Sequence, residues 1–211
     1  HPLTIIGVEK QSRARLIKPI DLDTLIVTNA HKFTSNSWPT GHGLNLLNLD
    51  ILGNDNEIES GIGIGLSDGT SMNLERVYVS HFREVINASH SSYSITNSIF
   101  NENINFLVHR NHKYADTSRE DTIRLGHVNI LNTTDYVTNL GGAIDLEFQN
   151  SIIIDGQDFK TKESSFKGVG VKFNHVALDT NSIRLETDIL KSFTKNNKKT
   201  ESFSVIHVDN I

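Results

Sequence analysis

Short alternations of apolar and polar residues, separated by polar corners, run through the chain. Residues 46–51 read Leu-Leu-Asn-Leu-Asp-Ile, and residues 74–79 restate this as Leu-Glu-Arg-Val-Tyr-Val. Between these copies, residues 61–66 alternate glycine with an apolar residue, and a Ser-Asp-Gly turn follows. Period-two alternation is typical of β-strands, and glycine and aspartate favour turns. Each copy therefore predicts a strand, a sharp polar corner and a second strand.

The same motif recurs to the end of the chain at variable spacing. The apolar residue after the corner falls, in order, at Leu49, Val77, Ile99, Val128, Ile152, Val176 and Ile211. The copies are 22 to 35 residues apart, which predicts a solenoid of parallel strands, because surface loops on a coil can lengthen at little entropic cost. Asparagine suits the corners since it tolerates a left-handed backbone. His127 and His175 take corner positions too, and we expect them to hydrogen-bond neighbouring corners.

The asparagine corners, the alternating strands and the opening Leu-Thr-Ile-Ile-Gly-Val of residues 3–8 resemble the right-handed parallel β-helix of pectate-lyase-like proteins. The resemblance lies in the strand pattern and covers essentially the whole chain. It implies an all-β, single-stranded solenoid of about seven or more coils. The superfamily includes bacterial polysaccharide lyases and hydrolases, and the tail spikes or appendages of bacteriophages.

The repeat favours a single β-helix domain over residues 1–211. Residues 1–29 form its first coil, and three polar stretches are interpreted as loop insertions, at 30–42, 109–121 and 191–200. A solenoid needs caps over its terminal coils. Because residue 3 is already strand-like and the chain stops just past a corner, we expect a segment of a longer protein, or ends that other chains cover.

Composition narrows the possible partners. Charged residues make up 21% of the chain and the net charge is −5, which disfavours a nucleic-acid partner, because phosphate binding needs a basic face. No apolar stretch approaches about 18 residues, so membrane insertion is not expected. No signal peptide is visible at the start of the sequence, and the resemblance implies an extracellular or virion-tail location. Cysteine is absent, so disulfides do not stabilise the fold.

Two acidic residues on one strand are candidates for catalysis. If Leu146 points into the coil, Asp145 and Glu147 face solvent about 7 Å apart. Such a pair can supply the acid and the base for a glycosidic bond, or hold a divalent cation such as calcium in a lyase reaction. The simpler interpretation is that they solubilise an exposed strand. No other cofactor and no metal is expected, because no histidine pair shows ligand spacing with a third partner.

The insertion at residues 109–121 is the densest cluster of ionisable residues, and binding residues concentrate on such loops. His109 could act as a base, and Arg110 could neutralise a sugar carboxylate. The same offset after a corner is expected to place Asp50, Tyr78 and Asn129 in one outward column. The residues assigned to substrate binding are Trp38, Asp50, Tyr78, Tyr114, Arg119 and Asp121. Simpler roles for these positions are a packing lid, ordinary turns and a solvated loop.

The leading hypothesis is a β-helical body similar to phage tail-spike or appendage proteins, which binds bacterial surface polysaccharide as a homotrimer. The sequence leaves open whether the protein also depolymerises the glycan as a lyase or a glycoside hydrolase. One alternative is a free-standing secreted bacterial polysaccharide lyase or hydrolase. Another is a structural shaft or adhesin without catalysis.

Overall fold

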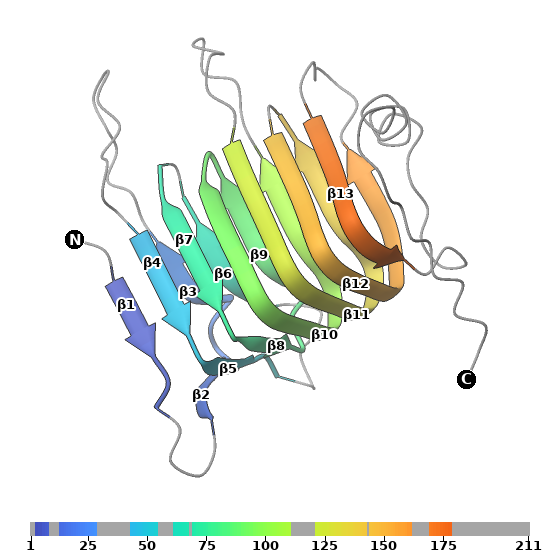
Figure 1. Ribbon diagram of the computed structural model, residues 1–211. Coiled ribbons are helices and arrows are strands. Elements are labelled where there is room, and N and C mark those ends of the chain that lie inside the picture. Colours follow the sequence, from blue (N-terminus) through green and yellow to red (C-terminus); the bar gives the residue numbers. More distant parts are fainter. Residues whose placement is uncertain are drawn as a thin grey trace.

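The computed structural model describes residues 3–8, 13–28, 43–54, 61–67, 69–110, 121–142, 144–161 and 169–178. Within this part the protein is all-β, and its parallel strands curl into a half-barrel (Figure 1). The described residues contain no helix with the length and apolarity that crossing a membrane would require. The curled parallel sheet is compatible with the predicted solenoid.

Nine short strands come first in the described residues, and four long ones follow. The short strands are β1 (Leu3–Ile6), β2 (Ala14–Ile17), β3 (Thr24–Thr28), β4 (Gly43–Leu47), β5 (Leu49–Leu52), β6 (Ile62–Leu66), β7 (Ser71–Glu75), β8 (Tyr78–Ser80) and β9 (Glu84–Ser89). The long strands are β10 (Ser92–Arg110), β11 (Asp121–Gly141), β12 (Ile144–Thr161) and β13 (Val169–Leu178). Successive parts of β10 pair with β7, β8 and β9, so one long strand corresponds to three short ones.

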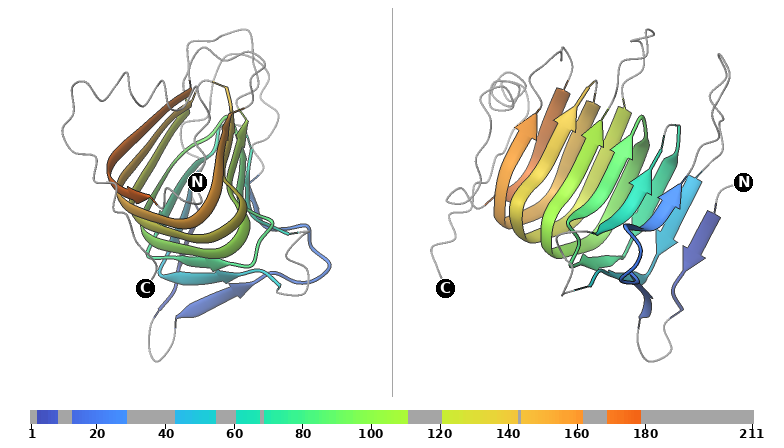
Figure 2. Two further views of the ribbon diagram at one scale, coloured as in Figure 1. Left: turned by 90° about the vertical axis from the view of Figure 1, so that its right-hand side faces the viewer. Right: turned by 180° about the vertical axis from the view of Figure 1, so that it is seen from behind.

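Each repeat therefore has three faces, which we call the front wall, the floor and the back wall. The front wall holds β1, β4 and β7, the floor holds β2, β5 and β8, and the back wall holds β3, β6 and β9. Strands β10, β11 and β12 continue through all three faces, and β13 continues through the first two. Seen along the sheet, the walls and the floor make the curled outline of the half-barrel (Figure 2).

The corners between the front wall and the floor lie where the sequence predicts them. All have positive φ angles between 48° and 58°, at Asn48, Arg76, Asn97, His127, Asn150 and His175. Asparagine populates this left-handed region more readily than most residues. Asn48 Nδ2 donates to the carbonyl oxygen of Gly7 at 2.9 Å, and Asn150 Nδ2 lies 3.4 Å from His127 Nε2. Hydrogen bonding between neighbouring corners is therefore confirmed for His127.

A second set of corners joins the floor to the back wall and was not predicted from the sequence. Its φ angles lie between 51° and 64°, at His81, Glu102, Asn132 and Asp155. These four corners have the same backbone conformation, but a different residue type occupies each one, so no sequence motif marks them. The adjoining Asn103 is 1% exposed and bonds the corner from inside. Its Oδ1 accepts from the Phe82 N–H at 3.0 Å, and its Nδ2 donates to the Asn101 carbonyl at 3.0 Å.

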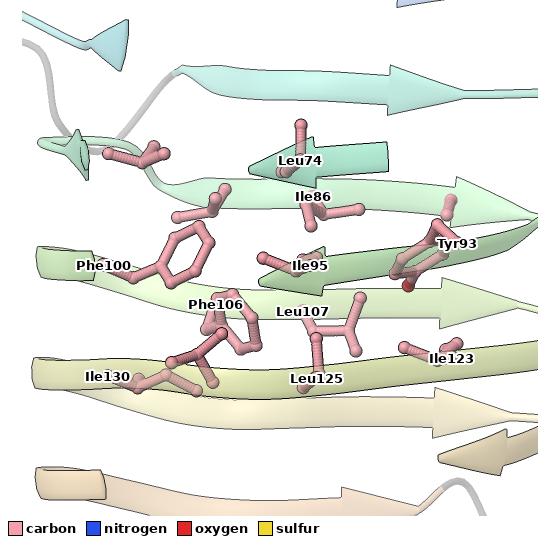
Figure 3. Packing of buried hydrophobic residues seen from close by; sticks show 14 of the residues in the cluster. Leu74, Ile86, Tyr93, Ile95, Phe100, Phe106, Leu107, Ile123, Leu125 and Ile130 are labelled. Atoms are coloured by element: carbon pink, nitrogen blue, oxygen red, sulfur yellow. The ribbon is translucent and has the colours of Figure 1, made fainter. Parts of the chain in front are cut away.

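The core fills the inside of the half-barrel, where side chains of successive repeats stack on one another. Figure 3 shows this packing for the middle repeats, with Ile95 and Leu125 in register on the front wall. Phe148 and Phe173 are also in register, and their rings stack 5.3 Å apart at an interplanar angle of 8°. Parallel pairing of like residues thus gives each repeat the same interior as its neighbours.

Two positions of the predicted repeat are displaced by one residue. The sequence pattern aligned Ile99 and Ile152 with the inward residues after the corners, but they point outward and are 38% and 40% exposed. Ser98 and Ser151 lie inside instead, 1% and 2% exposed. Each hydroxyl accepts from a backbone N–H of the adjacent repeat, at 3.2 and 3.3 Å. Each also donates to a carbonyl two residues earlier, so burial of the serines is compensated.

Candidate functional site

The outer face of the front wall carries a polar ladder. Parallel pairing places one residue of each repeat beside the next, in the order Thr4, Asn45, Asn73, Ser94, Arg124, Glu147 and Lys172. Neighbouring rungs bond to each other: Asn45 Nδ2 donates to Thr4 Oγ1 at 3.2 Å, and Ser94 Oγ donates to Asn73 Oδ1 at 2.9 Å. Strands in a sheet lie about 4.8 Å apart, so the ladder offers hydrogen-bonding groups at regular intervals.

Asp145 and Glu147 face outward on this wall, as predicted, but they lie within an ion-pair cluster. Arg124 Nη2 donates to Asp145 Oδ2 at 2.6 Å, and Arg124 Nε lies 3.3 Å from Glu147 Oε2. Lys172 Nζ donates to Asp145 Oδ1 at 3.0 Å. The two cations come from neighbouring repeats, 21 and 27 residues from Asp145 in the chain. Their role was not predicted from the sequence because it depends on the pairing register.

The cluster sets the charge of Asp145. Partial burial raises the pKa of this carboxyl, but hydrogen bonds and positive charges from Arg124 and Lys172 outweigh burial and leave the pKa below its ordinary value. A general acid that works near neutral pH needs a raised pKa. Asp145 is therefore ionised at neutral pH, which suits binding or electrostatic roles better than proton donation.

The predicted outward column is confirmed on the floor. Asp50 and Tyr78 lie side by side, and Asn129 follows two repeats beyond Tyr78. Asp50 Oδ1 lies 3.4 Å from Arg13 Nη1, and the Tyr78 hydroxyl accepts from Asn101 Nδ2 at 3.4 Å. The complete column, including the residues whose register was displaced, is Arg15, Asp50, Tyr78, Ile99, Asn129, Ile152 and Ala177.

Both ends of the predicted insertion at residues 109–121 belong to strands in the structure. Strand β10 extends to Arg110 and β11 begins at Asp121, so His109, Arg110 and Asp121 belong to strands and not to a protruding loop. Arg110 Nη1 donates to the carbonyl oxygen and to Oδ1 of Asn139, at 2.9 and 3.0 Å. These residues were assigned to a loop because a dense run of polar residues was interpreted as exposed.

His109 is fully buried and lies at the centre of a polar network between the two walls. Its Nε2 lies 2.8 Å from Asp121 Oδ2, and its Nδ1 lies 3.3 Å from the Tyr93 hydroxyl. Burial first, and then the negative charge of Asp121, raise the pKa of Tyr93 well above its ordinary value. Tyr93 therefore keeps its proton, and Figure 3 shows its side chain among the core residues. This geometry supports a structural role for His109 and Asp121.

The remaining predicted site residues, Trp38, Tyr114 and Arg119, lie outside the described residues, as do the insertions at 30–42 and 191–200. In the part of the chain that the structure describes, no three histidine or acidic side chains gather as metal ligands would. Comparison with known proteins identifies no relative: no family model, curated protein or solved structure matches the chain. Function is therefore inferred from the outer faces of the half-barrel.

Proposed function

We propose that the half-barrel is part of a right-handed parallel β-helix of the pectate-lyase-like kind, and that its front wall binds a bacterial surface polysaccharide. The polar ladder supports this proposal. Seven side chains in register, from Thr4 to Lys172, present hydroxyl, amide and charged groups along a single face. A linear glycan carries hydroxyl groups along its whole length, so it can exchange hydrogen bonds with several rungs at once.

Binding fits this face better than cleavage does. Both carboxylates of the candidate pair already contact Arg124, and the pKa of Asp145 is lowered. Depolymerisation is the second candidate function, because Asp145 and Glu147 lie on the same outer face as the ladder. The location in a virion tail or outside the cell, and the homotrimer, stay predictions from the sequence resemblance.

The binding proposal is tested with a panel of capsular and cell-wall polysaccharides. Calorimetry on the 211-residue chain is expected to detect at least one ligand. Asn73→Ala and Lys172→Ala should each weaken that binding about five- to tenfold, because each removes one hydrogen-bonding rung. Asn87→Ala is the matched control, since Asn87 lies on the back wall in register with Gly65 and Val108. If both front-wall variants bind the glycan as tightly as the unmodified chain does, the glycan does not bind at the front wall and the proposal is refuted.

Cleavage is tested on the same panel by following reducing ends and unsaturated products. If the protein depolymerises a glycan, Asp145→Asn and Glu147→Gln should each lower the rate. Bound glycan that stays intact would identify a binder or adhesin. Undiminished release in both variants would remove these residues from the catalytic site.

A further inference from the structure

The floor exposes isoleucines on its outer face in β10 and β12. Strand β12 reads Ser151-Ile152-Ile153-Ile154, yet only Ser151 and Ile153 point into the core, and Ile152 is 40% exposed. Strand β10 has the same arrangement: Ser98 points into the core and the next residue, Ile99, is 38% exposed. Parallel strands with apolar residues on both faces are typical of sheets that are covered on both sides. The outer face of the floor is therefore suited to contact with another molecule.

The chemistry of this face favours a protein surface. The first outward column is uncharged from β8 to β13, with Tyr78, Ile99, Asn129, Ile152 and Ala177, and the second is uncharged from β10 to β12, with Asn101, Leu131 and Ile154. Nucleic acids and anionic membrane surfaces require basic side chains. Sugar rings stack best on aromatic faces, and these columns contain a single tyrosine among branched aliphatic residues.

The first column has an internal symmetry centred on Asn129. Ile99 and Ile152 flank it in register, and beyond them lie one large residue, Tyr78, and one small residue, Ala177. A two-fold axis along the floor segment of β11 would set each isoleucine against the other isoleucine of a second copy. It would set Tyr78 against the partner's Ala177. Large therefore meets small, as an isologous interface requires.

The residues on the axis also match themselves. Asn129 would face the partner's Asn129, and the neighbouring outward residue of β11, Leu131, would face the partner's Leu131. Sheets that pack face to face lie about 10 Å apart, a separation at which two opposed asparagine side chains can exchange amide hydrogen bonds. A two-fold axis at right angles to the strands, running along the first column, would instead set Tyr78 against the partner's Tyr78 and Ala177 against the partner's Ala177, so large would meet large and small would meet small. The column therefore favours the first orientation.

In place of the homotrimer that the sequence resemblance implies, we propose that the outer face of the floor is a two-fold interface between copies of this chain, centred on Asn129 and Leu131. Five repeats about 4.8 Å apart and four residues wide cover roughly 300 Å² per copy, against about 800 Å² in a standard interface. An interface this small predicts a weak dimer that dissociates at low protein concentration. The interface is independent of glycan binding, because the polar ladder lies on the front wall.

The mass of the assembly is measured by sedimentation of the 211-residue chain over a wide concentration range. Asn129→Asp and Asn129→Lys are each expected to weaken dimerisation at least tenfold, because residue 129 faces itself and like charges oppose. An equal mixture of the two variants should dimerise again, since aspartate then faces lysine. A chain that stays monomeric at all concentrations, a trimer, or a mixture that fails to associate would overturn the proposal.

A cross-link tests the geometry separately. The chain has no cysteine, so Asn129→Cys introduces a single thiol, which a short bismaleimide should link to the same residue of a second copy. Ile17→Cys is the control, because Ile17 is 61% exposed on the floor but belongs to β2, outside the proposed interface. Equal cross-linking of both variants, or none at position 129, would contradict the two-fold axis. Circular dichroism confirms that each variant is folded.

Discussion

Two adjacent isoleucines of β12 test which side of the floor is the core. Ile153 is fully buried, whereas Ile152 is 40% exposed. Ile153→Ala removes three carbon atoms worth about 0.8 kcal/mol each, and the cavity left behind raises the expected loss of unfolding free energy to about 3 to 4 kcal/mol. Ile152→Ala removes the same atoms from an open face and leaves no cavity. Its expected loss is about 1 kcal/mol.

The assay is unfolding followed by far-ultraviolet circular dichroism, at a protein concentration low enough that the monomer dominates. In a chain of 211 residues, 1 kcal/mol corresponds to about 2 to 4 °C in Tm. Ile153→Ala should therefore lower the Tm by about 6 to 16 °C, and Ile152→Ala by about 4 °C or less. Equal losses, or a larger loss for Ile152→Ala, would contradict the register of β12 in the structure. They would support the register predicted from the sequence repeat, in which Ile152 points into the core.

Three further predictions concern polar groups. Asn103→Ala should cost about 2 kcal/mol in urea unfolding, because it leaves the buried Phe82 N–H without its side-chain acceptor; a loss below 0.5 kcal/mol would contradict this. Because the folded-state pKa of Asp145 is lowered, its stabilising effect is present above pH about 4 and lost as pH falls through the folded pKa. Asp145→Asn should thus lower the Tm more at pH 6 than at pH 2, and equal effects would exclude the ion pairs as the cause. In urea unfolding, Asp121→Ala should lower the free energy of unfolding more than Tyr93→Phe does, since Asp121 is the closer partner of His109. The reverse order would argue against this hydrogen-bond network.

The corners between strands could be predicted wherever a polar residue interrupts the apolar pattern of the sequence. Asn48, Asn97 and Asn150 were identified from an apolar residue, a polar corner and a return to apolar residues, and all three have positive φ. The outward orientation of Asp145 followed from simple alternation with Ile144 and Leu146, which are fully buried. These predictions succeeded because they depend on the local backbone and on the two faces of a strand.

The predictions that failed depend on partners far away in the sequence. Ser151 is inside because the N–H of Val128, in the adjacent repeat, donates to its hydroxyl, so a search for apolar residues selected Ile152 instead. His109 is buried because Asp121 and Tyr93 satisfy both of its ring nitrogens. Polarity alone predicts exposure for such residues, and only the stacking of repeats reveals that their hydrogen bonds are satisfied within the core.

The same stacking explains why the outer faces differ so sharply. In a parallel stack every outward position becomes a continuous column, and a column can change its chemistry without altering the inward residues that hold the repeats together. The repeats that contain Arg124, Glu147 and Lys172 on the front wall accordingly present Asn129, Ile152 and Ala177 on the floor. One face is therefore suited to a hydroxyl-rich polymer and the other to a second copy of the chain. Because the two columns share no residue, substitutions in one should leave the function of the other intact, so the two proposals can be tested separately on a single protein.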